Sequence, residues 1–193
     1  MQCSGRIGIL GGTFNPIHAG HLVLAEQAWQ QLRLEQVLFV PSAAPPHKAQ
    51  YSVAPAQARY RMVELAISFN PHFALSDIEL RRKGPSYSII TVKQLRKLYP
   101  KKKLFFLVGS DFLREFPFWK KIRQLRKLCT FVVARRPGYK IKHLPKDMCT
   151  LQVNALDISS TDIRRRLRGK ESIRYLVPEQ VRSYILRKKL YAS

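Results

Sequence analysis

The sequence predicts an α/β fold: a doubly wound, Rossmann-like, mostly parallel sheet in a single domain. Short apolar runs alternate along the chain with longer segments that carry apolar residues at helical spacing. Strands that are apolar throughout indicate a sheet covered on both faces, and the alternation of strand and helix favours parallel pairing. The 193 residues suit one domain, and neither a repeat nor a linker divides them. We therefore expect one domain spanning residues 1–193.

The first part of the chain predicts three strands and two helices. The expected order is strand Ile7–Leu10, helix His21–Leu34, strand Val37–Val40, helix Ala56–Phe69 and strand Phe73–Ser76. The first strand runs into Gly11 and Gly12, and glycine permits the tight turn that must follow. Each helix has apolar residues at the α-helical period, and a proline-rich loop at 41–56 joins the second strand to the second helix.

The rest of the chain predicts three more strands with helices between and after them. The expected order is helix Ser86–Tyr99, strand Leu104–Val108, a helical or mixed segment Asp111–Leu128 interrupted at Pro117, strands Phe131–Ala134 and Thr150–Val153, and helices Ser160–Leu167 and Pro178–Lys189. Doubly wound domains bind ligands beyond the carboxyl ends of the strands, where the strand order reverses. The loop after the first strand is therefore the first place to look for chemistry.

The charge is strongly positive and unevenly distributed. Lysine and arginine number 35 against 12 aspartate and glutamate residues, a net charge of +23. Residues 1–78 hold five basic and four acidic residues, whereas residues 79–193 hold 30 and 8, a net charge of +22. Three interpretations stay open: a solvated surface, a field that steers anionic substrates, and a nucleic-acid-binding role. No nucleic-acid-binding motif accompanies the charge, so nucleic acid is not the expected partner.

The cysteines and the apolar runs indicate a cytoplasmic protein. Cys3, Cys129 and Cys149 are odd in number and lack the spacing of metal ligands, which is typical of a reduced compartment. No apolar run approaches the roughly 20 residues of a membrane span. No signal-peptide-like stretch follows Met1 either, so we expect no membrane partner.

The first strand-to-helix loop, residues 11–21, carries the strongest chemical signal. Gly11 and Gly12 let backbone N–H groups approach a ligand closely. His18 and His21 lie three residues apart where a helix starts, so both imidazoles share one face. A helix start attracts phosphate, and imidazoles can donate hydrogen bonds to it. Surface histidines are the alternative reading, because the loop matches neither a GxGxxG dinucleotide loop nor a P-loop.

A second segment, residues 157–166, places hydroxyl groups at another helix start. Ser159 and Asp162 approximate a capping box, which by itself indicates only a capped, solvated helix. With Ser160 beside them and Arg164 one turn further, the segment also suits a second phosphate site. Two anion-binding helix starts in one domain favour a polyphosphate such as a nucleoside triphosphate.

At these residues the chain resembles the nucleotidyltransferases that carry H-x-G-H and I-S-S-T-x-I-R motifs, and most closely the bacterial nicotinate-nucleotide adenylyltransferases. The matching segments, in order, are Gly11–His21, Val40–Lys48, Gly84–Thr91, Val108–Asp111 followed by Trp119, Arg135–Gly138 and Ile158–Arg164. The resemblance implies that the 5′-phosphate of nicotinate mononucleotide attacks the α-phosphorus of ATP. Deamido-NAD forms and pyrophosphate leaves, a step of NAD biosynthesis. Mg²⁺ would come with ATP as its charge partner, without protein ligands of its own.

The resemblance also implies roles for particular residues. His18 and His21 would act on the ATP phosphates as the catalytic pair, and the helices from about residue 159 would complete the ATP site. The other implied ATP contacts are Gly11, Gly12, Thr13, Phe14, Gly109, Asp111, Ile158, Ser159, Ser160 and Arg164. Lys48 would reach a substrate phosphate, and Thr91, Trp119 and Arg136 would form the nicotinate pocket.

The chain departs from the family pattern at two positions, and other functions stay open. Asn15 and Ile90 stand where the family usually has Asp. Nicotinamide mononucleotide or phosphopantetheine could replace nicotinate mononucleotide as the acceptor. A catalytically inactive, basic nucleic-acid-binding protein is the alternative from another class. The sequence leaves the oligomeric state open, a homo-oligomer included.

Overall fold

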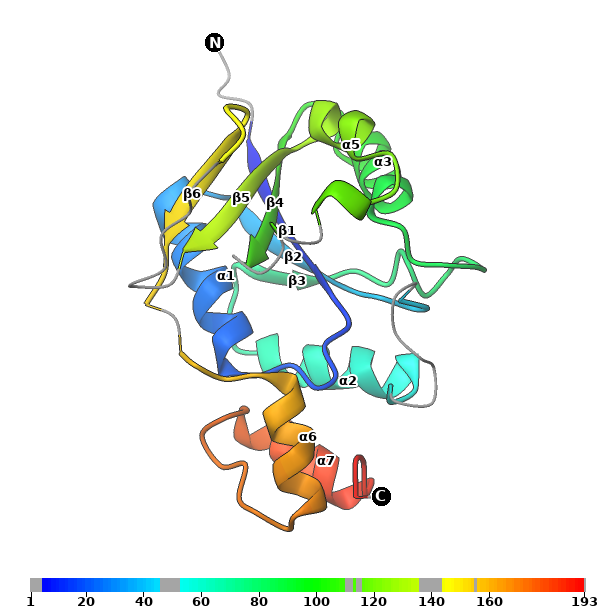
Figure 1. The fold of residues 1–193 in the computed structure, drawn as a ribbon, viewed down its shortest axis with the longest axis vertical. Helices are drawn as coiled ribbons and strands as arrows, with labels where there is room; N and C mark the ends of the chain where they lie inside the picture. The colour runs from blue at the N-terminus through cyan, green and yellow to red at the C-terminus, as the bar shows by residue number, and fades with distance from the viewer. Residues whose placement is uncertain are drawn as a thin grey trace.

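A six-stranded parallel sheet forms the centre of the computed structural model, which describes residues 5–45, 53–109, 113, 116–135, 144–154 and 156–192 (Figure 1). The strand order is β3-β2-β1-β4-β5-β6, and every neighbouring pair is parallel. The strands are β1 Arg6–Gly12, β2 Gln36–Pro41, β3 Phe73–Leu75, β4 Lys103–Gly109, β5 Thr130–Arg135 and β6 Met148–Gln152. This order confirms the predicted doubly wound fold, in which the sheet is parallel throughout its described strands.

Helices cover both faces of the sheet. They are α1 Ala19–Leu32, α2 Ala56–Ile67, α3 Ser88–Leu98, α5 Ile122–Leu128, α6 Ser160–Arg168 and α7 Glu179–Arg187. One apolar cluster contains α1 and α2 with one face of the sheet, and a second contains α3 and α5 with the other. The buried side chains of α6 and α7 belong to the first cluster. In Figure 1 these two helices lie together at the end of the molecule opposite the N terminus.

The strand order reverses between β1 and β4. From β1 the chain proceeds through β2 to β3 on one side, and β4, β5 and β6 then extend the sheet on the other. Connections that leave β1 and β4 therefore diverge and open a crevice at their carboxyl ends. The predicted phosphate-binding loop, which follows β1, lies at this switch point.

Two helices start two residues away from the positions predicted. We expected a helix at 21–34, but α1 begins at Ala19 because His18, with φ −147°, is the extended residue that precedes it. We expected a helix from Ser86, but α3 begins at Ser88. Ser86 instead pairs with Ala44: its N–H donates to the Ala44 carbonyl at 2.9 Å, and its hydroxyl accepts from the Ala44 N–H at 3.1 Å. Tertiary hydrogen bonds thus override the local helical pattern.

The segment predicted as helical or mixed is divided, as the proline suggested. A short 3₁₀ turn, η2, covers Phe116–Phe118, and α5 follows it. Lys121, the residue before α5, adopts the left-handed conformation with φ +54° and separates the two. Within the described ranges, no helix combines the length and apolar character needed to span a bilayer.

Candidate active site

The turn after β1 is part of the packed interior. Phe14, Asn15, Ile17 and His18 are each at most 7% exposed. Phe14 has φ +48°, in the left-handed region that residues with a side chain rarely adopt. Its ring lies edge-on to the imidazole of His21, with the ring centroids 5.1 Å apart. Burial of this kind holds the backbone of the loop in one shape.

His18 and His21 are in contact at the start of α1. Their ring centroids are 3.8 Å apart, and the His18 N–H donates a hydrogen bond to His21 Nδ1 at 3.3 Å. An imidazole whose Nδ1 accepts a bond carries its proton on Nε2 when neutral, so His21 offers an Nε2–H donor. Gly20 relieves crowding in this arrangement, because a Cβ there would lie 3.1 Å from His18 Nδ1.

The start of α6 docks directly on this loop. The Ser160 hydroxyl donates to the carbonyl of Pro16 at 2.9 Å, and Arg164 Nη1 donates to the carbonyl of Asn15 at 2.8 Å. Ser159 precedes the helix and accepts from the Asp162 N–H at 3.0 Å, as the capping box predicted. The structure therefore brings the two predicted phosphate-binding helix starts together. In this arrangement the Ser160 hydroxyl donates its proton to the loop, whereas the Ser159 hydroxyl, which accepts a bond, can still donate its proton to a ligand.

A buried arginine that the sequence analysis missed, Arg59, also holds this loop by hydrogen bonds. Arg59 is 1% exposed, and its guanidinium donates to the carbonyls of Ala54, Thr13 and Ala43 at 2.9, 2.7 and 3.2 Å. Burial lowers the pKa of Arg59. Its three hydrogen bonds all go to uncharged carbonyl groups. The sequence did contain a signal, because Arg59 lies on the apolar side of α2 with Met62 and Val63.

Asn15 joins the loop to two other parts of the chain. Its side-chain oxygen accepts from the Ala54 N–H at 3.0 Å and from the Tyr191 hydroxyl at 2.8 Å. Burial raises the pKa of Tyr191, which keeps this hydroxyl protonated and able to donate. The amide oxygen accepts both bonds without the charge of the aspartate that the family pattern usually has here.

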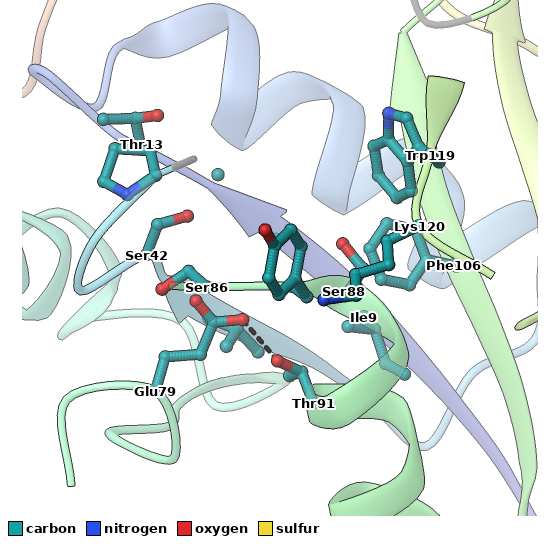
Figure 2. Close-up of a pocket in the computed structure, with 15 residues that line it drawn as sticks. Ile9, Thr13, Ser42, Glu79, Ser86, Ser88, Thr91, Phe106, Trp119 and Lys120 are labelled. Atoms are coloured by element: carbon teal, nitrogen blue, oxygen red, sulfur yellow. Dashed lines mark hydrogen bonds between the residues drawn. The ribbon is translucent and has the colours of Figure 1, made fainter. Parts of the chain in front are cut away.

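A cavity of about 350 Å³ lies beside the loop, at the carboxyl ends of β1 and β2 (Figure 2). The lining residues come from β1 and its loop, the end of β2 and its loop, the segment between β3 and α3, the start of α3, β4 and the segment before α5. They are Ile9, Gly11, Gly12, Thr13, Val40, Ser42, Pro45, Glu79, Ser86, Tyr87, Ser88, Thr91, Phe106, Trp119 and Lys120. Five of these, Gly11, Gly12, Thr13, Thr91 and Trp119, are among the predicted site residues. Trp119 packs edge-on against Phe106, with the ring centroids 5.8 Å apart.

One wall of the cavity carries a buried acid. The Glu79 side chain is 7% exposed, and its carboxylate lies 3.5 Å from Arg82 Nη2. The Thr91 hydroxyl donates to Glu79 Oε1, as Figure 2 shows. Thr91 thus lines the cavity, but its proton is already engaged. Its neighbour Ile90 is 41% exposed and does not line the cavity.

Of the predicted site residues that the structure describes, Gly109 does not join the cavity. Gly109 ends β4 and is exposed, outside the cavity lining. Lys48, Asp111 and Arg136 lie outside the described residues. The sequence analysis in turn did not assign six polar residues of the lining to the site: Ser42, Glu79, Ser86, Tyr87, Ser88 and Lys120. Within the described ranges, no cluster of three or more His, Cys, Asp or Glu side chains could hold a metal ion.

Comparison with known proteins defines the class. A family model described as cytidylyltransferase-like matches residues 9–166, which includes the loop after β1 and most of α6. The fold and the site are thus those of a nucleotidyltransferase, and the chain is an enzyme of that class.

Curated relatives define the family more narrowly. A protein of Thermus thermophilus named "Probable nicotinate-nucleotide adenylyltransferase" is 47% identical over 186 residues, covering 96% of this chain and 99% of the relative. A Desulfitobacterium hafniense protein of the same name is 44% identical and covers 96% and 95%. The chain belongs to the nicotinate-nucleotide adenylyltransferase family.

A solved structure shows the same fold in a distant relative. It is that of Plasmodium falciparum nicotinic acid mononucleotide adenylyltransferase complexed with NaAD. The two structures align with a TM-score of 0.82 and 21% sequence identity over 97% of each chain.

Proposed function

We propose that this protein transfers the adenylyl group of ATP to nicotinate mononucleotide. An oxygen of the mononucleotide 5′-phosphate forms a bond to the α-phosphorus, the bond from that phosphorus to the β-phosphate oxygen breaks, and pyrophosphate leaves. The product is deamido-NAD. The observation that carries the proposal is the docking of α6 on the first loop through Ser160 and Arg164, because it joins two anion-attracting helix starts next to the cavity.

In this proposal the histidines stabilise charge on the triphosphate. His21 donates from Nε2 to an oxygen of the α-phosphate, and its bond from the His18 N–H fixes the direction of that donation. His18 lies 3.8 Å away, ring to ring, and contacts the adjacent phosphate. Ser159, Ile158 and the first backbone N–H groups of α6 receive the β- and γ-phosphates, with Arg164 as the nearby cation.

The cavity suits the mononucleotide. Trp119 and Thr91 border the pyridine ring, while Gly11, Gly12 and Thr13 lie where the two substrates meet. The Phe14 ring packs edge-on against the imidazole of His21 and helps to hold it in position. Lys48, Arg136, Gly109 and Asp111 keep the roles that the family resemblance implies: Lys48 on a substrate phosphate, Arg136 on the nicotinate, and Gly109 and Asp111 on the adenosine.

Mg²⁺ fits this site as an ion that arrives with ATP. It prefers phosphate oxygens and water, and it is commonly bound through substrate phosphates rather than by a protein cage. The described side chains around the loop offer hydroxyl, imidazole and guanidinium groups, which suit phosphate oxygens better than Mg²⁺. When bound, Mg²⁺ lowers the negative charge that an incoming 5′-phosphate meets.

Pyrophosphate release tests the proposal. We would incubate the protein with ATP, Mg²⁺ and, in parallel, nicotinate mononucleotide, nicotinamide mononucleotide or phosphopantetheine. We expect turnover with nicotinate mononucleotide. Turnover with phosphopantetheine alone, or with none of the three acceptors, would contradict the proposed function.

The His21→Ala variant tests the role of the imidazole. We expect kcat to fall by about 10²- to 10⁴-fold, because the lost donor acts on charge that develops in the transition state. The matched control is His72→Ala, which removes a histidine stacked on Trp29 and remote from the cavity lining. A His21→Ala enzyme that folds and retains near wild-type kcat would remove His21 from the mechanism.

A further inference from the structure

Lys120 places a positive charge on the wall of the cavity. Its Nζ lies 4.1 Å from the centre of the Tyr87 ring, and both residues line the cavity. An ammonium group held over an aromatic face is not neutralised by it, and the N–H donors that point away from the ring remain for other partners. Of the lining residues that the structure describes, Lys120 alone is a cation.

The opposite charge lies on another wall. Glu79 is the acidic residue of the lining, and Figure 2 shows it on the other side of the cavity from Lys120. Arg82 and the Thr91 hydroxyl contact the same carboxylate oxygen of Glu79, and its second oxygen, Oε2, is buried without a hydrogen-bond partner among the described residues. An anionic group on a ligand is therefore disfavoured near Glu79 and favoured near Lys120.

The aromatic side chains of the lining suit the binding of a flat ligand ring between these two walls. Trp119 is the neighbour of Lys120 in sequence, and it packs against Phe106 on the cavity wall. A pyridine ring next to Trp119 lies close to the position of the lysine. Nicotinate and nicotinamide rings have nearly the same shape, and they differ by one negative charge. A pocket that separates them must therefore recognise the carboxylate by its charge and its purely accepting oxygens, since shape offers little.

We propose that Lys120, held in place by Tyr87, binds the carboxylate of the acceptor's pyridine ring and thereby selects nicotinate over nicotinamide mononucleotide. This inference rests on the proposed function. Lys120 is a specificity-determining residue, because its charge complements the one group in which the two acceptors differ. Glu79 strengthens the selection by disfavouring the reversed placement of the ring.

The test compares the ratio of kcat/KM for nicotinate mononucleotide to kcat/KM for nicotinamide mononucleotide. We expect Lys120→Met to lower this ratio by about tenfold or more, mainly through KM for the nicotinate acceptor. The matched control is Lys121→Met, which removes the adjacent exposed lysine that does not line the cavity. It should leave the ratio within about twofold of the wild type, since a change of that size is small against the effect of a direct contact.

Each other outcome overturns the inference in a distinct way. An unchanged ratio in Lys120→Met removes the role of its ammonium while the proposed function stands. An equal fall of this kcat/KM ratio in Lys120→Met and Lys121→Met assigns the preference to the general positive field of the protein rather than to Lys120. A wild-type protein that turns over neither pyridine nucleotide contradicts the proposed function, and the inference falls with it.

Discussion

At the scale of single residues, Arg59 shows how a buried cation can organise a site through backbone carbonyls. Its three hydrogen bonds reach carbonyls in the loop after β1, the loop after β2 and the segment before α2. Loss of the guanidinium would leave those carbonyls buried and unsatisfied, which costs more than the bonds themselves contribute. Arg59 is therefore a positioning residue for the loop that carries His18 and His21.

The Arg59→Lys variant tests this role. We expect the free energy of unfolding to fall by about 2–4 kcal/mol, because one ammonium cannot reach three divergent carbonyls. Urea unfolding followed by circular dichroism measures the change. The control is Arg61→Lys, an exposed arginine that pairs with Glu64 and should shift stability by under about 1 kcal/mol. Equal effects of the two variants would contradict the role of Arg59.

Cys129 gives a pH-dependent prediction at the same scale. Burial raises the pKa of this thiol to about 12 from its ordinary value of 9.0. Between those values the folded protein keeps a proton that the unfolded chain loses, so stability decreases as pH rises above about 9. From pH 8 to pH 10 we expect the wild type to lose about 1 kcal/mol more unfolding free energy than Cys129→Ala. Cys149→Ala, at an exposed cysteine, is the control, and identical pH profiles for wild type and Cys129→Ala would refute the prediction.

At the scale of elements, α6 connects the carboxyl-terminal part of the chain to the first loop. It shares an apolar cluster with α1 and α2, and its Ser160 and Arg164 side chains donate hydrogen bonds to loop carbonyls. The helix therefore has two functions in our proposal: it supplies an anion-attracting start, and it fixes the loop that holds the catalytic histidines.

The Ser160→Ala variant separates these contributions. It removes the bond to the Pro16 carbonyl and should lower the free energy of unfolding by about 1 kcal/mol. We also expect kcat to fall, because His18 and His21 are then held less firmly in position. Urea unfolding and pyrophosphate release measure the two effects on one preparation. Ser183→Ala on α7, where the hydroxyl contacts Glu179 on the same helix, is the matched control. A loss of stability without any loss of kcat would exclude a positioning role.

The predicted elements differ in how well local sequence defined them. The strands β1, β2, β4 and β5 follow from apolar runs, because a strand buried on both faces needs apolar residues throughout. The edge strands β3 and β6 are only partly buried, so their apolar signal is weaker. Helix starts were less well predicted, since the hydrogen bonds of Ser86 and the extended backbone of His18 depend on distant parts of the fold. The motif loops were found because their residues are contiguous. Glu79 and Lys120 were not, because only the topology brings their segments to one cavity.

At the scale of the whole molecule, the uneven charge agrees with an enzyme whose proposed substrates are both anions. The net charge of +22 on residues 79–193 belongs to the part of the chain that supplies α6 and the Trp119–Lys120 wall of the cavity. Some of these charges are paired locally, as Arg165 and Arg166 are with Asp162 and Glu171. The excess produces a positive field that attracts phosphates from a distance.

Ionic strength tests whether this field serves catalysis. Raising NaCl from about 50 to about 500 mM should lower kcat/KM by about three- to tenfold, because salt screens long-range attraction. At saturating substrate, kcat should change much less, since contacts inside the site are screened weakly. Steady-state assays at constant free Mg²⁺ measure both. A kcat/KM that is independent of salt would make the basic half a solvated surface without a role in substrate capture.

The amide at position 15 has a consequence for the conditions under which the protein can work. A carboxylate there would gain a proton in mildly acidic medium, and its two acceptor contacts would weaken as it did. The Asn15 amide does not titrate in that range, so its bonds from Ala54 and Tyr191 persist. At this position the shape of the histidine-bearing turn is thereby insulated from acidity.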